Sequence, residues 1–213
     1  MVKVLRTQDD LSLAAVELGS GALALLPTET VYGIGVAVSA FSGFDAIPGE
    51  GTGYGRIFTL KKRDVAQTVP WLVDGPLALD RYGVDVPRAV RDLASAFWPG
   101  ALTLVVQASS EVPTFMCAAD GTVALRASAS PVIQDLIRLC GSPLAVTSAN
   151  THGAPAPVSF QAVEKRILDG VDIAVDAGGT PCREASTIIA VKNGVPAILR
   201  EGAVGARAIF EAL

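Results

Sequence analysis

The feature that most constrains this chain is a repeated alternation between short apolar runs and stretches with apolar residues at helical spacing. Val86, Val90, Leu93 and Phe97 form one such helical stripe, and an apolar run from Leu102 to Val106 follows it. The same order recurs along most of the sequence, and helices that alternate with buried strands are typical of α/β folds. We therefore expect a sheet covered by helices.

Capping and turn residues indicate where the elements begin and end. Ser130 and Pro131 are typical of a helix start, and Gly141 is typical of a helix end. The chain of 213 residues fits one domain, and no repeat or interdomain linker interrupts it. The predicted helices cover residues 11–18, 86–97, 131–140, 160–168 and a short segment after 205, and the predicted strands cover 22–26, 102–106, 144–147, 173–175, 187–191 and 197–199.

A glycine-rich stretch at residues 39–55 interrupts this alternation. It contains five glycines and Pro48 and has no Lys or Arg. Glycine has a high conformational entropy in the unfolded chain, so this composition predicts a flexible loop without a stable helix. Loops of this length are often mobile covers over active sites, although simple disorder is an equally good reading.

The charge balance argues against a protein that binds nucleic acid with its whole surface. Lys and Arg number 17 against 21 Asp and Glu, which gives a net charge of −4. Binding to many phosphates requires clustered cations, so only a local basic cleft remains possible.

Metal centres and export are also disfavoured. The cysteines Cys117, Cys140 and Cys182 are far apart in sequence, and His152 is the single histidine. We therefore expect no protein-bound metal and no disulfide framework. The N-terminal residues lack a signal-peptide pattern and no apolar run is long enough for a membrane span, so we expect a cytoplasmic protein without membrane contact.

Two candidate binding segments lie in the first third of the chain. In residues 26–35, Thr28 and Thr30 flank a carboxylate directly after an apolar run, although a strand end with an N-cap threonine fits equally well. In residues 57–63, Lys61 and Arg63 alternate; on an extended segment they would share one face and could bind phosphate together. A solvated charge cluster is the alternative. From this reading, replacing either cation by Ala should lower turnover and leave the melting temperature nearly unchanged.

Two further candidates lie in the second half of the chain. The apolar run at 144–147 ends in small polar residues that include Ser148 and Asn150, a pattern consistent with an anion-binding loop or a simple turn. Arg200 ends another apolar run, and Arg126 ends a third, so either guanidinium could bind an anion or pair with a surface acid. His152 reads as a polar loop residue.

Taken in order, these segments resemble the YrdC-like family, whose best known members are threonylcarbamoyl-AMP synthases of the TsaC type. The resemblance spans residues 22 to 204, and the segments that carry it are Leu-Pro-Thr-Glu-Thr-Val-Tyr-Gly (26–33), Lys-Lys-Arg (61–63), Phe-Trp-Pro-Gly-Ala-Leu-Thr (97–103), Val-Ala-Leu-Arg (123–126), Thr-Ser-Ala-Asn (147–150), Ala-Ser-Thr (185–187) and Leu-Arg-Glu-Gly-Ala (199–203). The resemblance implies a single α/β domain over residues 1–213, with a twisted mixed sheet and helices around a deep basic cavity, and without the extra C-terminal domain of longer relatives.

The resemblance also implies a reaction and roles for nine residues. L-threonine, bicarbonate and ATP would form threonylcarbamoyl-AMP and pyrophosphate for the t6A modification of tRNA, with Mg²⁺ carried by ATP. Possible partners are tRNA or double-stranded RNA, and downstream threonylcarbamoyl-transferase proteins. The implied roles are catalysis and nucleotide binding for Lys61 and Arg63, nucleotide binding for Ser148, Asn150, Ser186 and Arg200, and threonine binding for Thr28, Thr30 and Arg126.

Three departures from the family pattern bear on the threonine site. The glycine-rich stretch 39–55 replaces a helix of ordinary composition, Asp64 stands where a proline is common, and residues 68–73 contain no histidine. Two other functions therefore stay open: an enzyme that handles carbamoyl-adenylate, and a noncatalytic protein that binds double-stranded or ribosomal RNA.

Overall fold

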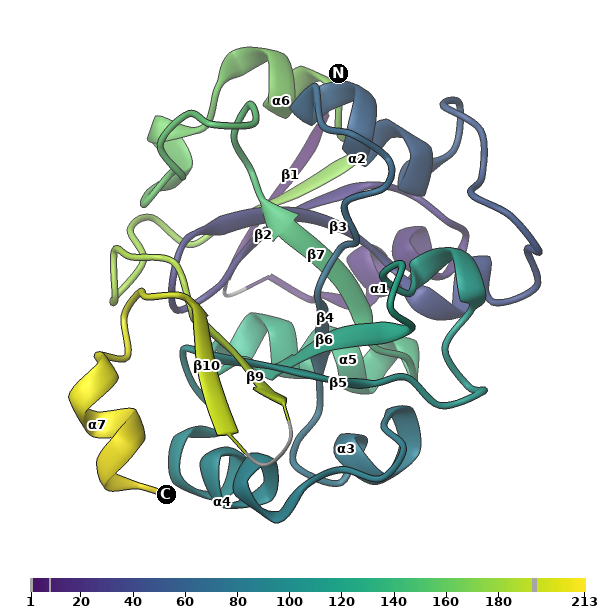
Figure 1. Ribbon diagram of the computed structural model, residues 1–213. Coiled ribbons are helices and arrows are strands. Elements are labelled where there is room, and N and C mark those ends of the chain that lie inside the picture. Colours follow the sequence, from purple (N-terminus) through teal and green to yellow (C-terminus); the bar gives the residue numbers. More distant parts are fainter. Residues whose placement is uncertain (1, 8, 193–194) are drawn as a thin grey trace.

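One mixed sheet forms the centre of the molecule (Figure 1). The computed structural model describes residues 2–7, 9–192 and 195–213. Within these residues the strands lie in the order β1-β8-β2-β3-β7-β4-β6-β5-β9-β10, with both parallel and antiparallel neighbours. Their bounds are β1 (Lys3–Arg6), β2 (Ala24–Pro27), β3 (Tyr32–Ala37), β4 (Trp71–Val73), β5 (Leu102–Gln107), β6 (Thr122–Ala127), β7 (Leu144–Ser148), β8 (Ile173–Asp176), β9 (Thr187–Lys192) and β10 (Val195–Arg200).

Helices pack on both faces of this sheet. Helices α1 (Ser12–Gly19) and α5 (Pro131–Cys140) pack together on one face, in a cluster that contains Leu18, Ile133 and the strand residues Leu72 and Val146. The other face carries the larger core, which includes Tyr54 from α2 (Gly53–Lys61). The remaining elements contribute to this larger core and are α3 (Ala78–Tyr82), α4 (Arg88–Phe97), α6 (Lys165–Asp169), α7 (Ala206–Glu211) and the 3₁₀ segments Val38–Phe41, Thr114–Met116 and Phe160–Ala162.

Local sequence explains where the long helices begin and end. Helix α5 begins at Pro131, and it ends before Gly141, which adopts a positive φ of 59° that suits glycine. Its residues Val132, Ile133, Leu136 and Ile137 repeat at helical spacing and are all buried against the sheet. The α/β class predicted from the alternation is confirmed.

The boundaries differ from the predictions at several places. The predicted strand at 22–26 begins at Ala24, the helix predicted from Val86 begins at Arg88, and the helix predicted at 160–168 is a 3₁₀ segment followed by the short helix α6. Sequence patterns gave no prediction for β1, β3, β4 or α3. Strand β1 has only one buried residue and β4 has only three residues, so neither forms a recognisable apolar run, and β3 is buried along its whole length, so it has no polar alternation.

The prediction that residues 39–55 contain no helix is wrong at both ends of the stretch. A 3₁₀ segment covers Val38–Phe41, helix α2 begins at Gly53, and Phe41 and Tyr54 are buried with their rings 5.9 Å apart. Only residues 42–52 form a loop between these elements. Thr52 caps α2, because its side-chain oxygen accepts a hydrogen bond from the Gly55 backbone N–H.

The glycines of α2 allow a close approach of backbones. A Cβ at Gly53 would collide with the carbonyl oxygen of Gly21, and a Cβ at Gly55 would collide with that of Gly49. At these two positions glycine is therefore required by packing, and the low side-chain content does not signal flexibility.

Candidate active site

A cavity of about 410 Å³ opens on the sheet face that α1 and α5 cover. Leu72 and Val146 belong both to the α1/α5 cluster and to the cavity wall, so the cavity continues this face beyond the helices. All nine residues singled out from the sequence line it: Thr28, Thr30, Lys61, Arg63, Arg126, Ser148, Asn150, Ser186 and Arg200. Segments that are up to 172 positions apart in the chain, from Thr28 to Arg200, thus meet at one place.

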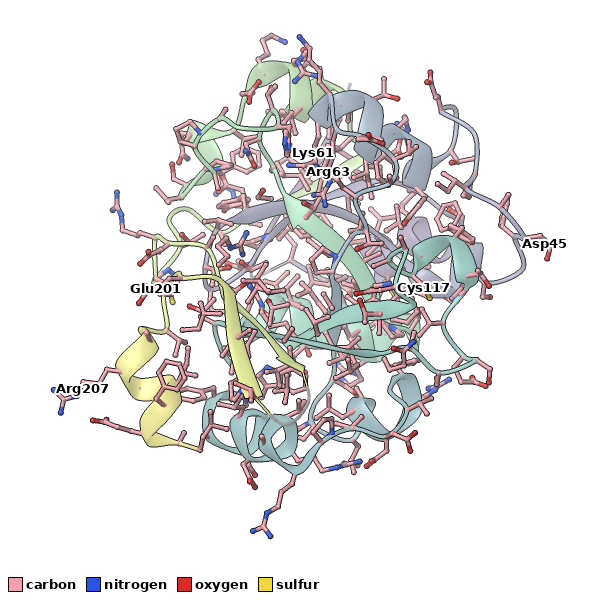
Figure 2. The ribbon with its side chains drawn as sticks, viewed as in Figure 1. Asp45, Lys61, Arg63, Cys117, Glu201 and Arg207 are labelled. Atoms are coloured by element: carbon pink, nitrogen blue, oxygen red, sulfur yellow. The ribbon has the colours of Figure 1, made fainter. Side chains whose placement is uncertain are left out.

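Lys61 reaches the cavity from the end of a helix, so the extended segment expected from the sequence is wrong. It is the last residue of α2, and Lys62 then adopts a left-handed conformation with φ of 50°. This turn folds the chain back, and the Arg63 N–H donates to the carbonyl of Phe58. Figure 2 shows Lys61 and Arg63 close together at this turn, and both line the cavity.

The Lys61 side chain is buried, with an exposed fraction of 2%. Its ammonium donates to the backbone carbonyls of Ser148 and Asn150 and, at 3.3 Å, to the Asn150 Oδ1. Burial, followed by the nearby Arg63 charge, lowers the pKa of Lys61 to about 8. Lys61 therefore both fixes the turn after β7 and places a positive charge at the cavity wall.

Arg63 is half-buried beside Lys61. Its guanidinium donates to the Thr147 Oγ1 at 3.0 Å and to the Thr68 carbonyl at 2.6 Å. Its Nε is buried without a hydrogen-bond partner. A buried donor without a partner is costly, so this arrangement favours a bound acceptor or anion nearby.

Arg126 lines the cavity from β6. It donates to the Thr30 Oγ1 at 3.1 Å, and the hydroxyls of Thr30 and Thr28 are 2.7 Å apart. The Thr28 hydroxyl also lies 2.6 Å from the Val31 carbonyl, which can only accept. Because arginine is only a donor, the proton direction is fixed: Arg126 donates to Thr30, Thr30 to Thr28, and Thr28 to the carbonyl.

A buried carboxylate lies behind Arg126. Glu29 Oε2 is 3.3 Å from the Arg126 guanidinium and also accepts a hydrogen bond from the Ser128 hydroxyl. Glu29 Oε1 and Arg126 Nε are buried without hydrogen-bond partners. Burial lowers the pKa of Arg126, and the Glu29 charge opposes that shift. The ion pair therefore offsets part of the cost of burying this arginine.

Arg200 completes the cationic lining from β10. Its Nε and one terminal nitrogen donate to the Ser186 carbonyl at 3.1 and 2.7 Å, and the same terminal nitrogen is 3.2 Å from the Ser186 Oγ. The Ser186 hydroxyl is 2.8 Å from the Thr103 hydroxyl. These bonds join β5 and β10 to Ser186, the residue directly before β9.

Asn150 is held inside its own loop. Its side-chain nitrogen donates to the carbonyls of Thr151 and Ala154 at 2.9 and 2.6 Å, and its Oδ1 faces Lys61. Ser148, two residues earlier, is half-buried at the end of β7. Asn150 thus lines the cavity while its polar atoms shape the loop.

Several cavity residues were missed from the sequence. Thr147 and Thr68 each accept a hydrogen bond from Arg63, Thr103 bonds the Ser186 hydroxyl, and all three line the cavity with Gln67. Thr103 and Thr147 lie inside segments that resemble the family, so position alone could have indicated them. His152, expected to be a polar loop residue, is exposed in a loop and also lines the cavity, where its backbone N–H donates to the Lys61 carbonyl.

The departures from the family pattern lie outside the cavity or leave it intact. Asp64 is exposed, is not among the lining residues, and accepts a hydrogen bond from the Ala66 N–H. Trp71 is buried on the opposite face against Tyr82, whereas Leu72 faces the cavity. The loop at 42–52 contributes no lining residue, and Figure 2 shows its residue Asp45 at the edge of the molecule, far from Lys61 and Arg63. Its predicted role as a mobile cover stays a prediction.

The lining defines the class of ligand. Four cationic side chains line the cavity, and among the described residues of its wall none is acidic. In the described part of the chain no group of three His, Cys, Asp or Glu side chains is placed to hold a metal ion. No described helix is long and apolar enough to cross a membrane. The fold and site thus define an α/β protein with a cavity suited to an anionic ligand such as a nucleotide.

Comparison with known proteins narrows this class to a family. The family model Sua5/YciO/YrdC, described as telomere recombination, matches residues 17–202. The chain belongs to this family.

Three relatives illustrate the similarity. A Mycobacterium tuberculosis relative is 34% identical over 194 residues, covering 91% of this chain and 84% of the relative. A threonylcarbamoyl-AMP synthase of Vibrio cholerae is 29% identical, covering 87% of this chain and 98% of the relative. A crystal structure of P. abyssi Sua5 complexed with L-threonine is 29% identical with a TM-score of 0.87; it covers 100% of this chain, which spans 61% of that protein.

Proposed function

We propose that this protein is an L-threonylcarbamoyladenylate synthase, a nucleotidyltransferase of tRNA t6A modification. The observation that carries the proposal is the meeting of all nine predicted residues in one cavity with four cations and no acid among its described lining residues. The substrates would be L-threonine, bicarbonate and ATP, with Mg²⁺ arriving as part of the nucleotide. The similarity to synthases of this name supports the assignment.

The proposed reaction has two bond-forming steps. The threonine amine attacks bicarbonate, which loses water and leaves a carbamate. A carbamate oxygen then attacks the α-phosphorus of ATP, the bond from that phosphorus to the bridging oxygen breaks, and pyrophosphate leaves. Both steps bring anions together, so positioning and charge neutralisation would supply most of the rate.

The geometry suggests how the residues divide this work. Lys61 and Arg63 would neutralise the triphosphate and the carbamate, with Ser148, Asn150, Ser186 and Arg200 holding the nucleotide. Arg126 also lines the cavity, and its Nε has no hydrogen-bond partner; its guanidinium would bind the carboxylate of threonine. Thr28 and Thr30 would hold Arg126 in place through their hydroxyl relay.

Product identification tests this proposal directly. The purified protein is incubated with ATP, bicarbonate and each amino acid in turn, and the products are identified by mass spectrometry. We expect an adenylate only with bicarbonate present, and most of it with threonine. A parallel incubation replaces bicarbonate and the amino acid with carbamoyl phosphate, which supplies a carbamoyl group; an adenylate that forms only there would instead indicate a carbamoyl-adenylate enzyme. No adenylate in either mixture would reject the synthase.

The cellular setting follows from the same proposal. A synthase of this kind would act in the cytoplasm and would pass its labile product to a threonylcarbamoyl-transferase protein that acts on tRNA. Direct contact with tRNA or double-stranded RNA is less favoured, because the cations of this site line a cavity and not an outer face. Co-purification of a transferase with the tagged protein would support the transfer step.

A further inference from the structure

Three polar side chains bond the segments that carry Lys61 and Asn150, on the side where α6 packs against α2 (Figure 1). They are Thr151, Glu164 and Arg166, and we call them the outer clamp. None of the three is among the described residues that line the cavity. The division of work proposed above does not use them, although two of them are charged.

Glu164 holds Thr151 through both of its carboxylate oxygens. It is the residue directly before α6. The Thr151 backbone N–H donates to Glu164 Oε1 at 2.8 Å, and the Thr151 hydroxyl donates to Oε2 at 2.7 Å. These backbone and side-chain hydrogen bonds lower the pKa of Glu164, so its carboxylate is charged at neutral pH. Two charge-assisted bonds to one residue fix the orientation of that residue.

Arg166 extends the clamp to the end of α2. Its Nη2 donates to the Thr151 hydroxyl at 2.7 Å, and its Nη1 donates to the Leu60 carbonyl at 2.6 Å. Leu60 directly precedes Lys61, and Thr151 directly follows Asn150. One planar guanidinium therefore ties together two segments that each carry a cavity residue.

The same two segments are also joined from the cavity. There the Lys61 ammonium donates to the carbonyls of Ser148 and Asn150. Helix α6 is itself fixed on α2, because Arg56 donates to the Gly170 carbonyl at 3.1 Å. The loop after β7 is thus bonded by the cavity lysine and by a clamp on an element that cannot shift independently of α2.

The clamp also acts on the charge of the cavity. The charged or titratable side chains next to Lys61 along these contacts are Arg63 in the turn after α2, His152 in the loop, and Glu164 and Arg166 at α6. Burial, followed by the Arg63 charge, lowers the pKa of Lys61, and the Glu164 carboxylate opposes this shift. Removing the Glu164 charge should therefore let Lys61 lose its proton at a lower pH.

From this connectivity we propose that the outer clamp positions the anion site, with Glu164 holding the loop at 148–151 in register with Lys61. Arg166 and Glu164 are 41% and 39% exposed, so their bonds contribute little to global stability and their main effect is on geometry. This inference rests on the proposed function, because it takes the cavity as the site of the ATP phosphates.

Calorimetry with inorganic tripolyphosphate and with ATP measures the anion site without requiring turnover. Glu164→Gln keeps the side-chain shape and loses one acceptor, and Arg166→Lys keeps the charge but cannot reach both acceptors. Each should weaken binding of both ligands about fivefold, which corresponds to about 1 kcal/mol. Asp169→Asn is the matched control, because it removes the same charge from the exposed side of the same helix, where Asp169 pairs with Lys165.

Substitutions at Thr151 separate positioning from simple stabilisation. Thr151→Val removes the hydroxyl that joins Glu164 to Arg166 and should weaken binding as Glu164→Gln does, whereas Thr151→Ser keeps that hydroxyl and should restore the affinity. The loss of tripolyphosphate affinity with rising pH should occur at lower pH in Glu164→Gln than in the wild type. A role in stability alone would lower the melting temperature and leave the affinity and the pH profile unchanged.

Each outcome decides the proposal. Wild-type affinity in Glu164→Gln, Arg166→Lys and Thr151→Val would overturn the clamp, whatever their melting temperatures; if Glu164→Gln does not fold, the two Thr151 variants decide. Pyrophosphate release measured on the same proteins keeps the two proposals separate. Release by the wild type with unchanged affinities in the clamp variants rejects only the clamp, and weakened binding in those variants with no release by the wild type rejects only the synthase.

Discussion

At the scale of single residues, every cation of the cavity is held by a hydroxyl or carbonyl partner. Arg63 bonds Thr147, Arg126 bonds Thr30, and Arg200 bonds Ser186. The sequence could indicate the cations, because each closes an apolar run. The sequence also indicated Thr30 and Ser186, but it could not show which cation each one bonds, because the partners lie far apart in the chain and only the folded sheet brings them together.

The buried ion pair of Glu29 and Arg126 should contribute strongly to stability. Their side chains are 9% and 7% exposed, so Glu29→Gln leaves the Arg126 charge buried without its counter-ion. We expect the free energy of unfolding to fall by about 3 kcal/mol, as for buried pairs that lose one partner. Urea denaturation of the wild type and of Glu29→Gln measures this difference in the free energy of unfolding.

The exposed pair of Arg88 and Asp92 provides the matched control. These side chains are 93% and 47% exposed, and Asp92→Asn should change the free energy of unfolding by less than about 1 kcal/mol. An equal small effect of Glu29→Gln would contradict the view that Glu29 stabilises the buried charge.

The lowered pKa of Lys61 predicts a pH dependence of anion binding. With a pKa of about 8 against an ordinary 10.5, Lys61 carries its charge below pH 8 and loses it as the pH rises through 8. Tripolyphosphate affinity should therefore fall between pH 7 and pH 9.5 in the wild type. In Lys61→Met it should be low already at pH 7 and should match the wild type at pH 9.5. Because the ligand ionises identically in both measurements, the comparison of the two proteins corrects for its ionisation. Parallel curves of affinity against pH for the wild type and Lys61→Met would contradict the prediction.

The same lysine corrects an expectation about stability. A cation on an extended surface segment could be removed without lowering the melting temperature. Lys61 is instead 2% exposed and donates to three acceptors in the turn after β7. Replacing it by Ala should therefore lower stability as well as turnover, and Arg63→Ala is the cleaner test of charge alone.

At the scale of elements, the sequence predicted the strongly periodic helices and missed strands without a clear apolar run, such as β4. Helix α5 has four buried residues at helical spacing and clear terminal residues, so its prediction is nearly complete. Strand β4 has three residues, all buried, and no pattern separates it from a loop. Helix α2 was missed because two of its first three residues are glycines, whose role in close packing is visible only in the fold.

The glycines of residues 49–55 allow a matched test of this packing. A Cβ at Gly53 would collide with the backbone of residues 21–23, whereas a Cβ at Gly51 would meet nothing within 4 Å. Gly53→Ala should lower the free energy of unfolding by roughly 1–3 kcal/mol through overpacking. Gly51→Ala should leave the free energy of unfolding almost unchanged. Thermal denaturation of the two variants and the wild type measures the difference. Equal melting temperatures would favour the original prediction of a flexible loop at the start of α2.

At the scale of the whole molecule, charge is divided between an inner site and a balanced surface. Four cations line the cavity, whereas described surface cations such as Arg88, Arg91 and Arg207 pair with carboxylates at 3.5, 2.6 and 2.7 Å. With a net charge of −4, this division favours a small anionic ligand over a long nucleic acid.

The most direct test of this account measures pyrophosphate release in the presence of ATP, with and without threonine and bicarbonate. The account predicts release that requires both co-substrates, at least a tenfold loss in Arg63→Ala with an unchanged melting temperature, and no loss in the surface control Arg88→Ala. Release that is independent of threonine and bicarbonate, or full activity of Arg63→Ala, would contradict the claim that this cavity forms the adenylate.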